Sequence, residues 1–169
     1  MQTTNRVFNK RKVLTELRSA RSAQIQWRSY TQALTNSPDP ENTRNSAIQA
    51  YMRFSQWYDK SGKTLSELPA FDQLNRSHKV FEYLNNQMFE LLLSHTHQPA
   101  KNWFQQLVHE VNPKQKALSR LMPMVIKASN DLLSSVEKLE REIKAMPEQQ
   151  FNGMLAHQFP EYEQEFMVN

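Results

Sequence analysis

The chain has 169 residues, a formal net charge of +4, 38% hydrophobic residues, two glycines and no cysteine. The length predicts one domain, the absence of cysteine excludes disulfides, and so few glycines disfavour a compact α/β protein. The sequence contains no run of eighteen apolar residues, so no membrane span is predicted. The polar, basic start lacks the apolar core of a signal peptide. We therefore expect a cytoplasmic, helical protein.

The first helix is predicted over residues 9–34. Its apolar row has alternating spacings of three and four, which is the pattern of a core-facing helical stripe. The row contains Val13, Leu17, Ala20, Gln24, Trp27, Thr31 and Leu34. Two prolines at 38 and 40 should end this helix, since proline cannot continue a helical hydrogen-bond ladder.

The second helix should run from about residue 43 to 61, with Gly62 as a left-handed cap. Its core candidates are Ala47, Ile48, Tyr51, Met52, Phe54 and Trp57. A third helix is predicted over residues 70–95, and its core-facing row holds Phe71, Leu74, His78, Phe81, Asn85, Met88 and Leu92.

The fourth helical region is predicted over residues 101–146, with a break or restart at Asn112-Pro113. Nine residues follow a four-three alternation, namely Leu118, Met122, Val125, Ser129, Leu132, Val136, Leu139, Ile143 and Met146. This row favours the inner face of a bundle over a dimerising coiled coil, because three earlier helices need a fourth to close their core. Pro123 should kink the helix or mark its start.

These elements predict an all-α fold, an antiparallel up-down helical bundle of four main helices over residues 1–146. Residues 147–169 form a short acidic, aromatic C-terminal segment, running through Phe151, Leu155 and Phe166. This segment should pack on its own bundle; the alternative is that it docks into a partner.

Four short stretches share a spacing with a known family. They are Gln24-Ile25-Gln26-Trp27, Met52 to Trp57, the turn Leu68-Pro69-Ala70-Phe71-Asp72-Gln73-Leu74, and His78-Lys79-Val80-Phe81-Glu82. Over residues 18–95 this frame resembles a bacterial chemoreceptor zinc-binding domain. That family places His, Cys, His and His where this chain has Gln24, Met52, His78 and Glu82. The resemblance implies that these four positions converge inside the bundle.

The substitutions at those positions argue against zinc. A structural zinc site takes four thiolate, imidazole or carboxylate ligands, and here His78 and Glu82 alone qualify. We expect no bound metal and no cofactor, with Gln24, His78 and Glu82 hydrogen-bonded to one another instead. A metal-binding sensor that uses His78 and Glu82 is the alternative.

The chain carries no recognisable catalytic set, so we expect no enzymatic activity. Two glycines cannot form a phosphate-binding loop, and neither a cysteine nucleophile nor a Gly-x-Ser-x-Gly elbow occurs. The resemblance implies a bacterial signalling or regulatory protein acting through a protein partner, such as a chemotaxis or cyclic-di-GMP signalling component, or through homodimerisation. A helical adaptor, chaperone or inhibitor that binds a client protein is the alternative.

Charge is unevenly distributed between the two ends of the chain. Residues 1–30 hold seven Lys or Arg and one acid, Glu16, whereas residues 147–169 hold four Glu and no Lys or Arg. The basic start lacks the interleaved exposed aromatics of a nucleic-acid surface, so we expect no nucleic-acid partner. The two charged ends are instead candidate surfaces for protein association.

Overall fold

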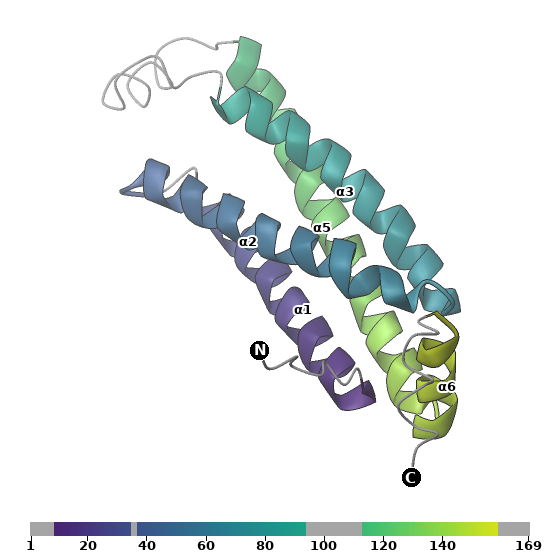
Figure 1. Cartoon of the computed structure of the whole chain (residues 1–169). Coiled ribbons are helices and arrows are strands. Elements are labelled where there is room, and N and C mark those ends of the chain that lie inside the picture. The colour runs from purple at the N-terminus through teal and green to yellow at the C-terminus, as the bar shows by residue number, and fades with distance from the viewer. Residues whose placement is uncertain (1–8, 35–36, 94–112, 159–169) are drawn as a thin grey trace. The chain divides into compact units, whose positions relative to one another are not determined.

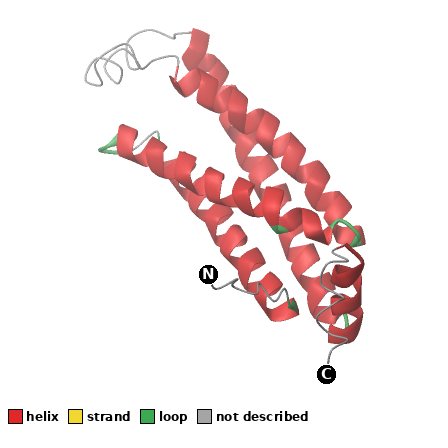
Figure 2. Cartoon of the chain, viewed as in Figure 1, coloured by secondary structure: helices red, strands yellow, loops and turns green. Residues whose placement is uncertain are grey.

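The computed structural model describes residues 9–34, 37–93 and 113–158. Within these ranges the chain is helical and contains no strand (Figure 2). The elements are α1 (Lys10–Ala33), α2 (Pro40–Lys60), the 3-10 helix η1 (Gly62–Leu65), α3 (Pro69–Leu93), α5 (Pro113–Ala145) and α6 (Glu148–Gln158) (Figure 1). The prediction of an all-α helical bundle is confirmed. The part of the fourth predicted helix before residue 113 lies outside the described residues.

The chain divides into two compact units. The first contains Met1–Leu74 and Leu133–Asn169, and the second contains Asn75–Leu132. The long helices α3 and α5 each contribute to both units. Because the end of α5 and the whole of α6 belong to the first unit, residue 146 is not a boundary between compact units.

In the first unit, α1 and α2 form a helical hairpin. Asn9 caps α1 by accepting a 2.8 Å hydrogen bond from the Lys12 amide, and Asp39 caps α2 in the same way from Asn42 at 3.0 Å. The predicted row on α1 is buried over its whole length. On α2 the buried residues are Ala47, Ala50, Phe54, Trp57 and Tyr58, and the rings of Phe54 and Trp57 lie 5.6 Å apart.

Two predictions for α2 are wrong. Met52 was predicted to face the core, yet it is 51% exposed, because it precedes Phe54 by two residues and such neighbours point to different sides of a helix. Gly62 was predicted to adopt a left-handed cap, yet no glycine in the described residues has a positive φ. The chain does not reverse there but continues directly into η1.

The end of α5 is joined to α1 by basic side chains of α1. Arg18 Nε donates to Glu140 Oε1 at 2.9 Å, Arg21 pairs with Glu137, and the Lys10 ammonium donates to the carbonyl of Lys144 at 3.0 Å. Lys144 also contacts Glu140 at 2.7 Å. Lys144 and Arg18 hold the pKa of the nearly buried Glu140 carboxyl below its usual range, and the hydrogen bond from Lys144 is the larger cause.

The helix α6 packs within the first unit. Phe151 and Leu155 are buried, and α6 contacts α1 and η1. This part of the C-terminal segment therefore docks on its own bundle, as predicted. Residues 159–169 lie outside the described residues.

The second unit consists of the later part of α3 and the earlier part of α5, which pack on each other (Figure 1). The predicted rows are buried on both helices, from His78 to Met88 on α3 and from Val125 to Leu132 on α5. Pro123 does not start α5, because the helix begins ten residues earlier at Pro113. The proline is exposed, so water can solvate the carbonyl that its missing N–H leaves free.

Candidate functional site

The four positions of the family frame do not form one enclosed site. Gln24 is fully buried on α1, whereas Met52 on α2 is half exposed. A side chain that faces solvent cannot share an interior site with one that faces the core. The prediction that all four side chains converge inside the bundle is therefore wrong for Met52.

His78 and Glu82 lie one turn apart on α3. His78 is buried and Glu82 is half-buried. They belong to the second compact unit, whereas Gln24 and Met52 belong to the first. Among the described residues, no three His, Asp or Glu side chains gather closely enough to hold a metal ion. The hydrogen-bonded network of Gln24, His78 and Glu82 stays a prediction.

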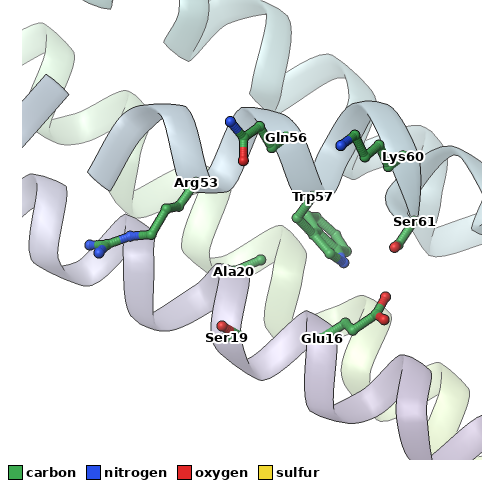
Figure 3. A pocket seen from close by; sticks show the side chains of 8 residues that line it. All are labelled: Glu16, Ser19, Ala20, Arg53, Gln56, Trp57, Lys60 and Ser61. Atoms are coloured by element: carbon green, nitrogen blue, oxygen red, sulfur yellow. The ribbon is translucent and has the colours of Figure 1, made fainter. Parts of the chain in front are cut away.

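A different site lies between α1 and α2, entirely within the first unit. It is a hollow of about 310 Å³ that is open on one side (Figure 3). Its walls come from α1, from the last turns of α2 and from the residue after α2. The residues that line it are Glu16, Ser19, Ala20, Arg53, Gln56, Trp57, Lys60 and Ser61.

Trp57 and Glu16 give the hollow its polar character. Trp57 is 8% exposed, and its Nε1 is buried without a hydrogen-bond partner among the described residues. Glu16 Oε2 is also buried and has no hydrogen-bond partner among the described residues. Figure 3 shows the indole nitrogen pointing to the side where the Glu16 carboxylate and the Ser61 hydroxyl lie. A donor, an acceptor and a hydroxyl thus lie on the same side of the hollow.

The chain just after α2 holds the indole in this orientation. A Cβ built on Gly62 would lie 3.5 Å from Trp57 Cη2 and Cζ3, so Gly62 lies against the six-membered ring. The opposite, nitrogen-bearing edge of the indole is left facing the hollow. The backbone at Gly62 therefore positions the indole of Trp57 without forming a hydrogen bond to its N–H.

Two cations lie on the α2 side of the hollow. Arg53 donates to the Oε1 of Gln26 on α1, and Lys60 stands one turn after Gln56. With Glu16, the formal charge of the lining is +1. These groups give the lining hydrogen-bond donors, an acceptor and charges of both signs.

Sequence reasoning placed Trp57 in the core and gave Glu16 no role. The available signal was that Glu16 is the single acid in the first thirty residues, among seven basic ones. In the fold, Arg18 and Arg21 of α1 pair with α5, while Glu16 faces α2. An acid that avoids the ion pairs of its own helix marks a surface with another role.

Comparison with protein-family models, with curated proteins and with solved structures finds no match to this chain. None of the described helices has both the length and the apolar character needed to cross a membrane.

Proposed function

We propose that this chain is a non-enzymatic bacterial regulatory protein, a metal-free relative of the chemoreceptor zinc-binding domain, that acts through contacts with a protein partner. The retained aromatic frame around Trp27, Trp57 and Phe71 supports the kinship. The exposed side chain of Met52 supports the metal-free part of the proposal, since one of the four ligand positions is turned to solvent.

The observation that carries the proposal is the outer face of α3 in the second unit. Val80 is 55% exposed and Tyr83 is 63% exposed, and they lie three residues apart, so they are neighbours on the helix surface. Arg76 and Gln87 continue the same face, and the Gln87 amide donates to the Tyr83 hydroxyl at 2.8 Å. This hydrogen bond orients the phenol along the helix.

The residue types on this face suit a protein interface. Tyrosine and arginine are over-represented among the residues that dominate binding energy, and a large apolar side chain gains most when a partner removes it from water. Val80 and Tyr83 fill no part of the core of α3, whose buried row runs through His78, Phe81 and Asn85. Their use by a partner would therefore leave the fold intact.

The basic first helix is a weaker candidate for the interface. Residues 1–30 were a candidate surface for association, but Lys10, Arg18 and Arg21 bind the end of α5 within the same unit. Their charges are used in folding. A partner that docks on the face of α3 would depend less on salt than one held by charged ends.

The test is affinity capture from native lysate with the wild-type chain and a double variant, Val80→Ser with Tyr83→Ser. We expect the wild type to retain a defined partner and the double variant to lose it with an unchanged circular dichroism spectrum. Met124→Ala, an exposed apolar position on α5 of the same unit, is the matched control and should still capture it. Equal capture by all three proteins would overturn the proposal.

The identity of the partner separates the two forms of this function. A chemotaxis or cyclic-di-GMP signalling component supports the kinship with the sensory domain, whereas an unrelated client supports a helical adaptor, chaperone or inhibitor. Light scattering over a range of protein concentrations tests the homodimer. If the face of α3 mediates self-association, the double variant is monomeric where the wild type is dimeric.

A further inference from the structure

We propose that the outer face of α3 pairs with the same face of a second copy of this chain, with the two helices antiparallel and Tyr83 at the two-fold axis. This inference rests on the proposed function, because it names the partner of the same face of α3. It is carried by the order of the charges along that face and by the exposure of the side chains between them.

Arg76, Tyr83 and Glu90 lie along one line of α3, because each is seven residues from the next. Seven residues turn an α-helix by about 700°, which is about 20° short of two full turns. All three side chains are exposed, and the buried row from His78 to Met88 lies on the other side of the helix. Because the whole line belongs to the second unit, it can be covered without any change in the core.

Arg76 and Glu90 carry opposite charges at equal distances from Tyr83. Within the part of the chain that the structure describes, neither forms an ion pair. In an antiparallel pair centred on Tyr83, Arg76 of each copy faces Glu90 of the other. The two-fold symmetry therefore forms this ion pair twice, as a self-complementary interface requires.

The same charges disfavour a parallel pair. Two parallel copies would place Arg76 against Arg76 and Glu90 against Glu90, and like charges that face each other across an interface oppose association. The spacing of seven also favours helices that cross at a shallow angle, because a line of this kind stays on one side of the helix over four turns. The charge order thus selects the antiparallel arrangement.

Tyr83 and Val80 supply the apolar centre of the pair, since they are 63% and 55% exposed. At the axis Tyr83 meets Tyr83 of the second copy, and two tyrosine rings attract each other when they are offset or tilted. On either side Val80 faces Asn86, and Lys79 faces the neutral Gln87. Gln87 also donates to the Tyr83 hydroxyl at 2.8 Å, which holds the phenol along the helix.

The extent of the face sets the strength of the dimer. From Arg76 to Glu90 the helix rises by about 21 Å, and a single pair of helices over that length belongs to the weak interfaces, which bury less than about 1,200 Å². We therefore expect a reversible dimer with a Kd of roughly 10–100 µM.

The test is sedimentation equilibrium of the full-length chain at concentrations below and above this Kd. Arg76→Glu and Glu90→Arg should each raise the Kd by at least about tenfold, because symmetry repeats the new like-charge contact twice. The combined variant, Arg76→Glu with Glu90→Arg, restores both ion pairs and should dimerise within about threefold of the wild type. An equimolar mixture of the two single variants should form a heterodimer that neither forms alone.

Arg120→Glu, a charge reversal at an exposed position on α5 of the same unit, is the matched control and should dimerise as the wild type does. Circular dichroism should show the same helix content for every variant. A wild type that stays monomeric, single reversals that dimerise as tightly as the wild type, or a combined variant that stays monomeric would each overturn the antiparallel pair. If the wild type is monomeric and Val80→Ser with Tyr83→Ser still loses a captured protein, the pairing is wrong and the protein-contact function stands.

Discussion

Glu140 offers the sharpest test of how the first unit is held together. Its side chain is 10% exposed, and its carboxylate forms ion pairs with Arg18 at 2.9 Å and with Lys144 at 2.7 Å. We consider the substitution Glu140→Gln, which removes the negative charge and keeps the shape and one acceptor oxygen. The two cations are then left without their counter-ion.

The expected loss follows from the exposure of the partners. A hydrogen bond to a charged group contributes about 1.5–3 kcal/mol when it is well shielded. Arg18 and Lys144 are 55% and 50% exposed, so water replaces much of what the carboxylate supplied. We expect a net loss of about 1–2 kcal/mol, which corresponds to roughly 2–8 °C in the melting temperature.

The pH dependence has a definite sign. The pKa of Glu140 is lowered in the folded chain from its ordinary value of 4.5, because Lys144 and Arg18 favour the charged form. Its contribution is therefore complete above 4.5 and is lost as the pH falls through the lower pKa of the folded state. The difference between wild type and Glu140→Gln should be largest at neutral pH and should shrink in acid.

The assay is urea unfolding of both proteins at neutral pH and at about pH 3, well below the ordinary pKa of glutamate. Glu137→Gln is the matched control, since Glu137 also pairs with an arginine of α1 but is 41% exposed. It should cost less than about 0.5 kcal/mol, as exposed pairs do. Equal losses for the two variants, or a loss for Glu140→Gln that does not change with pH, would refute the reasoning.

Four further substitutions test the packing. Trp27→Ala should lower stability by about 3–5 kcal/mol, because the indole is fully buried. Met52→Ala should change stability by less than about 0.5 kcal/mol, because Met52 is half exposed. Similar melting curves for the two variants would contradict the burial of Trp27 and the exposure of Met52. Gly62→Ala should be neutral or stabilising by up to about 1 kcal/mol in urea unfolding, since the φ of Gly62 is not positive and a Cβ would meet its nearest atom at 3.4 Å. Asn85→Leu should raise stability by about 1–3 kcal/mol, because both amide atoms are buried without partners among the described residues; a lower midpoint would indicate that the amide is satisfied.

The helices and their buried faces were predictable because the signal is local and repeated. On α1 the seven-residue row from Val13 to Leu34 is buried as predicted, and on α5 six consecutive members of the row, from Val125 to Ile143, are buried. Each row spans several turns, so one ambiguous residue does not change the face. Cap residues also act locally, which is why α1 begins beside Asn9.

The errors arose where the interpretation went beyond that periodicity. Met52 was placed in the core on the strength of the family frame as well as its apolar character, although it is out of phase with Ala50, Phe54 and Trp57. Gly62 was interpreted as a left-handed cap because glycine is common just after the end of a helix. Whether a glycine is left-handed depends on the direction of the next element, and that direction is not encoded in the glycine.

The hollow could not be predicted from the sequence because it depends on how two helices face each other. Glu16 and Trp57 are 41 positions apart, and only the pairing of α1 with α2 makes them neighbours. The pairing could be anticipated from the short connection between the two helices. The positions of Glu16 and Trp57 along the two helix axes, which decide whether their polar atoms lie near each other, could not be anticipated.

The two polar sides of α1 have separate roles in the first unit. Arg18 and Glu16 are two residues apart, so their side chains leave the helix about 200° from each other. The Arg18 side carries the ion pair with α5 and stabilises the unit, whereas the Glu16 side faces α2, where its buried Oε2 has no donor among the described residues. If both sides served stability alone, Glu16 would be expected to pair with one of the cations along its own helix. Substitutions of Glu16 and of Glu140 should therefore affect different sides of α1.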